Sequence, residues 1–297
     1  MNVPSHKPVE NIETKTILSK LKERDNFFGI SYNMNLYRGC QHACIYCDTR
    51  SECYGIGDIS KIKVKNNAID LLRKELKSKR KKRQTIGTGS MNDPYMPLEK
   101  QFGLTRKALE QIASNRFPVH IITKSNLVGR DIDIIKDISS VYSAVSFSIT
   151  TSSDSLSKLI EPNAPTSSKR FEALAQLSKH GIYAGVTMMP ILPFINDTMD
   201  NVNELLKMAK DSGAQYVIPM FGLTLRVGSR EYFYNSLDNS FPNLKKKYMT
   251  EFGQCYECYS PRYRQLIDSF NQQTCKLSLP SRMRFFTPTE PKQLELF

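Results

Sequence analysis

Short apolar runs alternate with longer amphipathic runs from about residue 30 to about residue 220. The short runs are mostly uncharged and are followed by loop residues, which is typical of buried parallel strands. We predict six strands, approximately at 30–36, 85–88, 119–123, 144–149, 182–188 and 216–220. The longer runs predict helices at approximately 67–81, 105–114, 131–138, 168–180 and 198–211.

This alternation predicts an α/β fold, a partial (β/α)6 TIM-like barrel with a parallel sheet and a C-terminal helical and irregular extension. We expect an N-terminal arm at 1–29, the barrel at 30–222, the extension at 223–286 and a proline-containing flexible tail at 287–297. Ligands of such sheets bind at the carboxyl ends of the strands, so the residues just after each strand are the first functional candidates.

Composition and charge narrow the functional classes. With 40% hydrophobic residues in 297, the chain can bury a core. Its 42 Lys and Arg against 29 Asp and Glu give a net charge of +13, which favours a polyanionic partner such as DNA or another nucleic acid. No apolar run reaches the ~18 residues of a membrane span, and the start lacks a secretory segment. We therefore expect a cytoplasmic protein without a membrane partner, whose seven cysteines are metal ligands or thiols.

Three cysteines fall in one loop directly after the first predicted strand. Cys40, Cys44 and Cys47 have C-x-x-x-C-x-x-C spacing. A structural zinc site takes four protein ligands, whereas an iron–sulfur cluster held by three thiolates leaves one iron open to a small molecule. His42 lies between two of the cysteines and would have to fold back sharply to complete a zinc site.

The loop, with Tyr46 directly before the third cysteine, resembles the signature of the radical S-adenosylmethionine (SAM) superfamily. The resemblance implies a [4Fe-4S] cluster on Cys40, Cys44 and Cys47, with SAM bound to the open iron. It implies that one electron cleaves SAM to methionine and a 5′-deoxyadenosyl radical, which abstracts hydrogen from a substrate. A reductant such as flavodoxin or ferredoxin would supply that electron.

Loops after later strands carry groups suited to binding SAM. Gly89 and Ser90 follow the second strand, where glycine lets the backbone approach a ligand closely. Lys124 follows the third strand, Ser148 ends the fourth, and Arg170 lies on the next helix. Each residue also has an ordinary structural explanation as part of a turn, a solvated surface or a packed strand.

Together, G-T-G-S-M-N-D-P-Y, T-K-S, E-P-N-A-P and P-I-L-P-F-I-N-D resemble the branch related to spore photoproduct lyase over roughly residues 30 to 220. That resemblance implies lyase-like radical chemistry on DNA or a DNA-associated substrate, as in DNA repair, and we consider Tyr95 or Cys53 as carriers of the hydrogen atom. The same chemistry on RNA or on a protein is an alternative. A zinc-stabilised, non-enzymatic adaptor that binds nucleic acid is another.

The remaining cysteines and basic segments leave alternatives open. Cys255, Cys258 and Cys275 suit a second metal, a redox pair or buried thiols. The basic run at 77–83 fits either a solvated helix end or phosphate contacts. The mixed aromatic and basic segments at 259–264 and 282–286 fit either stacking with phosphate neutralisation or ordinary packing.

The last five residues form a further motif. Gln293, Leu294, Leu296 and Phe297 resemble the pentapeptide by which bacterial DNA polymerases and repair proteins dock on the sliding clamp. Two apolar side chains on a proline-containing leash suit an apolar groove on a partner, and packing on the chain's own barrel is the alternative.

Overall fold

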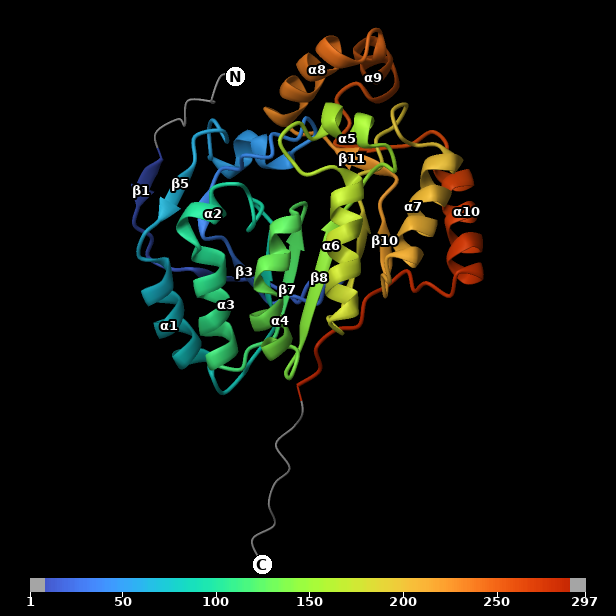
Figure 1. Cartoon of the computed structure of the whole chain (residues 1–297). Helices are drawn as coiled ribbons and strands as arrows, with labels where there is room; N and C mark the ends of the chain where they lie inside the picture. Colours follow the sequence, from blue (N-terminus) through green and yellow to red (C-terminus); the bar gives the residue numbers. More distant parts are fainter. Residues whose placement is uncertain (1–8, 289–297) are drawn as a thin grey trace, which may run out of the picture.

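Seven strands form the central sheet of the computed structural model, which describes residues 9–288 (Figure 1). The strand order is β10-β9-β8-β7-β6-β3-β2, and neighbouring strands are parallel except for the edge pair β2 and β3. The parallel strands are β3 (Tyr32–Met34), β6 (Ile86–Thr88), β7 (Val119–Thr123), β8 (Ser143–Ser148), β9 (Ala184–Met188) and β10 (Val217–Pro219). All six predicted strands are therefore confirmed.

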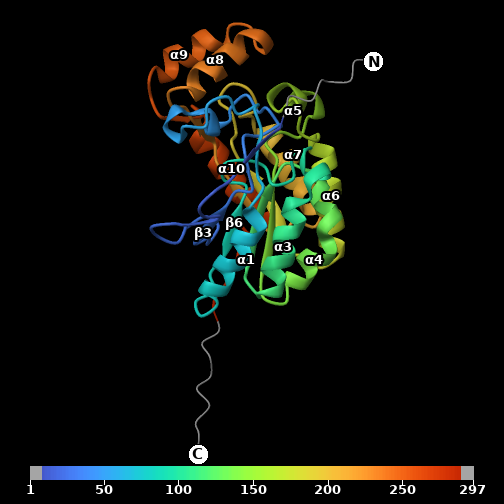
Figure 2. The same ribbon diagram turned by 90° about the vertical axis from the view of Figure 1, so that its left-hand side faces the viewer.

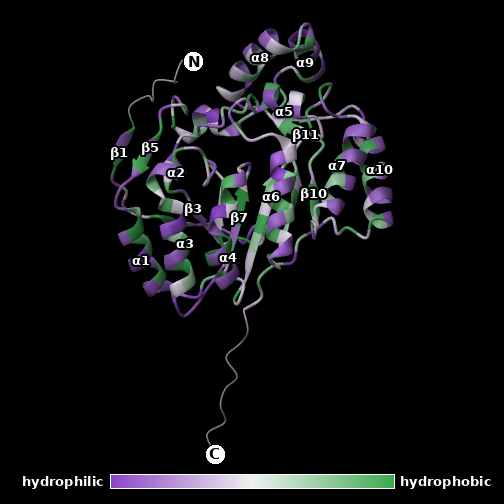
Figure 3. Ribbon diagram, in the orientation of Figure 1, coloured by the Kyte–Doolittle hydropathy of each residue, from purple (hydrophilic) through white to green (hydrophobic). Residues whose placement is uncertain are grey.

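Five helices connect these strands and confirm the five predicted ones. They are α1 (Ala68–Lys79), α3 (Leu104–Ser114), α4 (Ile132–Ile138), α6 (Ser167–Lys179) and α7 (Met199–Asp211). Figures 1 and 2 show α1, α3, α4 and α6 on one face of the sheet. Leu72 and Leu76 of α1 lie one turn apart and are both fully buried, as an amphipathic helix requires. Figure 3 shows hydrophilic and hydrophobic positions alternating along these helices.

Several short elements were not predicted from the sequence. β2 (Leu18–Lys20) pairs antiparallel with β3. A small sheet contains β1 (Glu10–Ile12), β5 (Lys63–Lys65) and β4 (Tyr37–Arg38), and the helices α2 (Glu99–Phe102) and α5 (Asp154–Ile160) lie in loops of the barrel. The segment expected as an N-terminal arm thus contributes two strands.

The segment beyond β10 is helical with one ladder of strands. It consists of β11 (Gly222–Thr224), α8 (Ser229–Ser240), α9 (Leu244–Phe252), β12 (Glu257–Tyr259) and α10 (Tyr263–Lys276). In Figure 1, α8 and α9 lie above the carboxyl ends of the parallel strands, and α10 packs beside α7. A second apolar core joins Cys44, Ile45 and Tyr46 to side chains of this segment, including Phe233 and Tyr248. Within residues 9–288, no helix has the length and apolar character to cross a bilayer.

Candidate active site

The cysteine loop follows β4 and is fixed by backbone hydrogen bonds. The Cys40 N–H donates to the Ile59 carbonyl at 2.9 Å, and the Ile45 N–H donates to the Ile160 carbonyl at 2.9 Å. Gly39, just before the first cysteine, has φ +88°, and a Cβ there would lie 2.6 Å from the Ile59 carbonyl oxygen. Only glycine fits this turn without strain, so the sequence locally dictates where the first thiol lies.

All three cysteines line one cavity of about 320 Å³ at the carboxyl ends of the strands. Five of the predicted cofactor-binding residues line the same cavity: Tyr46, Gly89, Ser90, Lys124 and Ser148. They come from the loops after β4, β6 and β7 and from the end of β8. The sheet thus brings together residues about one hundred positions apart, as the rule for parallel sheets predicts.

The donor set fits an iron–sulfur cluster better than a single zinc ion. Burial raises the pKa of Cys40 to about 12 and that of Cys44 well above its ordinary value, so the thiolates require a cationic centre for stability. A single zinc ion holds each sulfur at about 2.3 Å. Among residues 9–288, no three His, Cys, Asp or Glu side chains converge closely enough to hold a single metal ion. In a cluster, each thiolate binds a different iron.

His42 lines the same cavity as the three thiols, but its two ring nitrogens face other partners. Its Nε2 lies 3.2 Å from Oδ2 of Asp93, and its Nδ1 lies 3.4 Å from the carbonyl oxygen of Asn163. The ring is 1% exposed and lies between these two partners. His42 therefore serves the packing of the cysteine loop, which argues against the zinc site considered from the sequence.

Asp93 is a buried carboxylate that the sequence analysis missed. Its Oδ1 accepts hydrogen bonds from the Thr123 hydroxyl at 2.7 Å and the Tyr95 N–H at 2.8 Å, and its Oδ2 accepts one from the Lys124 N–H at 2.6 Å. Burial would raise the pKa of Asp93, but His42 and these hydrogen bonds hold it at about 2. The ionised carboxylate joins the loops after β6 and β7 on the cavity wall.

Arg170 lies behind the cavity wall instead of lining it. Its guanidinium forms an ion pair with Glu161, and both side chains are buried. It also donates to the carbonyl oxygens of Ser148 and Pro165, each at 2.8 Å. The Tyr46 hydroxyl donates to Glu161, so this ion pair positions two of the residues that line the cavity.

Lys124 and Gly89 line the cavity from the loops after two neighbouring strands, β7 and β6. The Lys124 ammonium lies 5.7 Å from the Tyr46 ring centroid. Burial would lower its pKa, but Cys44 and Glu161 outweigh burial and raise it, which keeps the ammonium charged. Gly89 has φ +88°, and a Cβ there would lie 2.3 Å from the carbonyl oxygen of Ile122. The backbone of this loop therefore packs too closely for any other residue.

The two residues predicted to carry a hydrogen atom do not reach the cavity. Tyr95 is fully buried, and its hydroxyl donates to Asp131 at 3.1 Å. Cys53 is exposed on a short 3-10 helix (Glu52–Tyr54). Neither residue lines the cavity, so the geometry supports neither in that role.

Within the described residues, Cys255, Cys258 and Cys275 do not converge on a single metal ion. Cys258 is buried with its Sγ 3.6 Å from the carbonyl oxygen of Cys255, while Cys255 and Cys275 are exposed. Burial raises the pKa of Cys258 to about 11. Cys258 therefore acts as an apolar packing residue.

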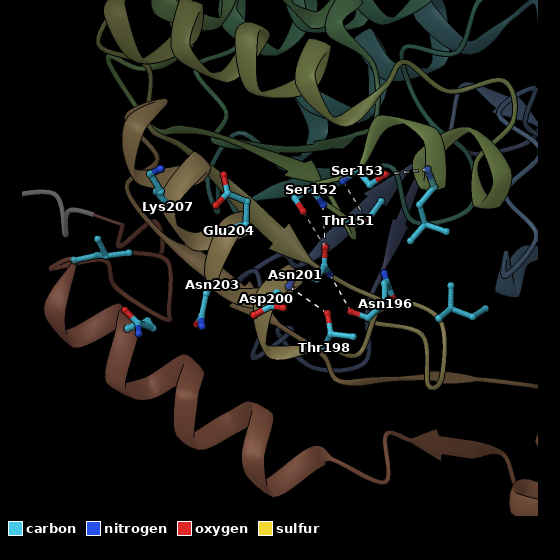
Figure 4. A pocket seen from close by; sticks show the side chains of 14 residues that line it. Thr151, Ser152, Ser153, Asn196, Thr198, Asp200, Asn201, Asn203, Glu204 and Lys207 are labelled. Atoms are coloured by element: carbon cyan, nitrogen blue, oxygen red, sulfur yellow. Dashed lines mark hydrogen bonds between the residues drawn. The ribbon is translucent and has the colours of Figure 1, made fainter.

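A larger groove of about 790 Å³ lies between α7, α10 and the loop after β8 (Figure 4). The Asn201 side chain binds backbone groups of this groove: its Oδ1 accepts from the Ser152 N–H at 2.9 Å, and its Nδ2 donates to the Asn196 carbonyl at 2.9 Å. None of the predicted site residues lines it. We interpret these hydrogen bonds as holding α7 against the sheet.

Comparison of the sequence with known proteins gives one family and several relatives. The family model described as "Radical SAM superfamily" matches residues 34–209. An uncharacterized protein of Mycobacterium tuberculosis is 30% identical over 243 residues, which cover 80% of this chain and 71% of the relative. A radical SAM Nalpha-GlyT isomerase of Pseudomonas phage M6 is 25% identical over 185 residues, covering 61% of this chain and 37% of that protein.

The fold is also similar to solved structures of spore photoproduct lyase. A tyrosine-to-phenylalanine variant of that enzyme has a TM-score of 0.70 at 15% identity, covering 92% of this chain and 79% of the other. The lyase complexed with dinucleoside spore photoproduct has a TM-score of 0.67 at 16% identity, covering 91% and 79%. At these identities, the similarity establishes the shared fold.

Proposed function

The chain belongs to the radical SAM superfamily, and from this premise we propose that it is a lyase-like radical enzyme acting on DNA, with a base presented to the cavity that the three cysteines line. Enzymes of this family use a [4Fe-4S] cluster and SAM. The observation that carries the DNA substrate is a band of exposed tyrosines and arginines beside the cavity.

The residues of the chain divide the cofactor-binding work. Cys40, Cys44 and Cys47 would hold the cluster, which together with SAM supplies the one-electron cleavage that generates a 5′-deoxyadenosyl radical. The backbone at Gly89 and the Ser90 hydroxyl offer acceptors for an ammonium group. The charged Lys124 side chain offers a cation for a carboxylate or a ribose hydroxyl. The barrel around them would exclude water and stray hydrogen donors once the cofactor is bound.

Asp48, which lines the cavity, connects it to the first part of the exposed band. The Arg226 guanidinium donates to Asp48 and to the hydroxyls of Tyr54 and Tyr256, each at 2.6 Å. It also lies 4.6 Å from the Tyr256 ring centroid. Tyr54 and Tyr256 remain 38% and 44% exposed, so part of each ring can contact a ligand although Arg226 lies against both.

The β11–β12 ladder extends the band from the cavity. Leu223 and Thr224 of β11 line the cavity, and Gly222 pairs with Tyr259 on β12. Tyr259 and Tyr263 are 49% and 41% exposed, with ring centroids 5.6 Å apart. Their groove also includes Arg262 and Arg264. Exposed aromatic rings beside arginines suit bases that have left a duplex, because the rings stack and the cations neutralise phosphate.

The test begins with the cofactor. We expect anaerobic reconstitution to yield four irons and four sulfides per chain, and dithionite reduction with SAM to yield 5′-deoxyadenosine. Cys44→Ala should abolish both, whereas Cys275→Ala, which alters an exposed thiol outside the cavity, should change neither. A colourless protein with stoichiometric zinc would instead establish the adaptor alternative.

The substrate is tested with the same holoenzyme. The double variant Y259A/Y263A should weaken binding of a thymine-rich DNA oligonucleotide by about tenfold or more and leave SAM cleavage without substrate unchanged. Equal affinity of the variant and the parent would contradict the DNA substrate. Preference for an RNA oligonucleotide of the same sequence would transfer the proposal to RNA.

Two partners belong to this proposal. A small reducing protein such as flavodoxin or ferredoxin would supply the electron. An iron–sulfur cluster and cysteines outside disulfides suit a reducing compartment such as the cytoplasm. Gln293, Leu294, Leu296 and Phe297 lie outside the described residues, and docking on a sliding clamp rests on that motif alone. Loss of clamp binding on deletion of residues 293–297 is the outcome that we expect in a pull-down assay.

A further inference from the structure

Another concave surface lies at the opposite edge of the sheet from the cavity. This groove of about 770 Å³ is formed by residues 80–84, Arg116, residues 140–142 and residues 285–288. The first three segments precede β6, β7 and β8, so the groove lies at the amino ends of the parallel strands. In Figure 1 this is the lower edge of the sheet, beyond the ends of α1 and α4.

Five exposed cations line this groove: Arg80, Lys81, Lys82, Arg83 and Arg116. Within residues 9–288, none of them forms an ion pair, and none of the residues that line the groove is acidic. A helix dipole favours cations only within the last turn of a helix. Arg80 is the C-cap of α1 and Arg116 lies two residues beyond the end of α3, so helix dipoles favour these two cations, whereas Lys81, Lys82 and Arg83 lie beyond the last turn of α1.

Aromatic side chains also line this groove, and hydrogen bonds and ring contacts hold them in place. Phe286 lies 6.2 Å from the Tyr142 ring, and its carbonyl accepts a hydrogen bond from Arg24 at 2.7 Å. The Arg24 guanidinium lies 5.3 Å from the ring centroid of Phe285, which is 36% exposed. The Tyr142 hydroxyl donates to the Arg284 carbonyl at 2.6 Å. The rings are therefore positioned in advance beside the cations.

We propose that this basic–aromatic groove binds a single-stranded nucleic acid, with phosphates on the cations and bases against Phe285 and Phe286. Cations alone would suit any polyanion, but positioned aromatic faces beside unpaired cations suit stacked bases. The groove shares no residue with the cavity or with the tyrosine band. It therefore goes beyond the proposed function as a second, remote contact with nucleic acid.

The test uses the full-length, reconstituted protein and a fluorescent oligothymidylate of about 20 nucleotides, longer than the usual site for a single strand. Anisotropy titrations between about 50 and 200 mM KCl give both the affinity and its salt dependence. We expect R80E/K81E/K82E to bind at least about tenfold more weakly. Its slope of log affinity against log salt should fall by about 2, the value for three lost phosphate contacts on a single strand.

A matched control separates the groove from net charge. K158E/K169E/K207E reverses three exposed lysines on α5, α6 and α7 and changes the net charge by the same amount. We expect it to lose less than about threefold, because charges far from the groove are screened. Equal losses in both triple variants would overturn the proposal.

Two further results decide the chemistry of the partner. Phe285→Ala should weaken binding by about tenfold without changing the salt slope, as expected for the loss of a stacked base. Poly-L-glutamate that displaces the oligothymidylate equally well at equal charge would assign the groove to an acidic protein and overturn the proposal. If R80E/K81E/K82E does not fold, Arg116→Glu, on a separate loop, tests the contribution of the cations in this groove.

SAM cleavage provides the independent readout. The groove variants should form 5′-deoxyadenosine at the parent rate, because the groove lies at the other edge of the sheet. Loss of oligonucleotide binding with intact SAM cleavage would support the groove whatever the substrate of the cavity proves to be. If the proposed function is wrong, either SAM cleavage will be absent or the Y259A/Y263A variant will bind DNA as tightly as the parent. Binding of the oligothymidylate in the groove would remain in both cases.

Discussion

Arg170→Met should strongly destabilise the protein without altering any residue of the cavity wall. Removing the guanidinium leaves the Glu161 carboxylate buried without its cation and deprives the carbonyls of Ser148 and Pro165 of their donor. Breaking a buried ion pair on one side costs about 3–5 kcal/mol. In the parent protein, burial would raise the pKa of Glu161, but the charges of Arg170 and, to a lesser extent, Lys124 outweigh burial and lower it. The pKa of Glu161 should therefore rise in the variant.

The magnitude can be measured by thermal unfolding of the anaerobic holoprotein. For a chain of this size, about 1 kcal/mol corresponds to about 2–4 °C, so the melting temperature should fall by about 6–20 °C. Lys169→Met, a substitution at an exposed position on the same helix, should leave it unchanged within about 2 °C.

A double-mutant cycle gives the refuting result. E161M/R170M removes both charges, so the double variant should be less destabilised than the sum of the single variants by about 1–3 kcal/mol. Additive losses, or a stable Arg170→Met protein, would show that the pair is not the buried interaction that the structure describes. The Tyr46 hydroxyl would still lack its acceptor, so full recovery is not expected.

Three other predictions follow from buried groups. His120 is buried, and desolvation lowers its pKa to about 3. Between about pH 6.5 and pH 3 the unfolded chain therefore binds a proton that the folded chain does not, so stability should fall with decreasing pH by up to about 1.4 kcal/mol per pH unit. The variant His120→Gln should flatten this part of the profile of unfolding free energy against pH. Gly89→Ala should reduce SAM affinity by at least about tenfold in calorimetry, because its Cβ would collide with the Ile122 carbonyl and its φ is strained. Tyr95→Phe should cost about 1–2 kcal/mol through the lost bond to Asp131 while SAM cleavage stays at the parent rate; an unchanged melting temperature would contradict this hydrogen bond.

The sequence was most informative where the physical cause is local. Residues 119–123 (V-H-I-I-T) are rich in β-branched residues and contain no Asp, Glu, Lys or Arg, so the run itself favours a buried strand, and it lies between two other strands. The cysteine spacing likewise specifies a loop, because Gly39 fixes its start. β2 could not be predicted in the same way, since Leu18 is its only apolar residue and its pairing with β3 stabilises it.

Site residues that depend on distant partners could not be identified from one sequence. Asp93 acquires its role from His42, Thr123 and Lys124, which are 51 positions before and about 30 positions after it in the chain. The same limitation explains Tyr95, which follows a cavity loop in sequence but turns into the core to meet Asp131. A polar residue in a loop after a strand indicates proximity to the site, and only the packing decides which way it faces.

The direction of the sheet separates the two binding surfaces. Loops after the strands carry the cysteines and buried carboxylates, whereas loops before the strands carry unpaired cations. β8 has six residues, so these two edges are about 20 Å apart at about 3.3 Å per residue. One nucleotide cannot occupy both surfaces. A nucleic acid that contacts the groove while a base enters the cavity must follow the outside of the barrel over several nucleotides, so the groove adds affinity for a long strand without contacting the reacting base.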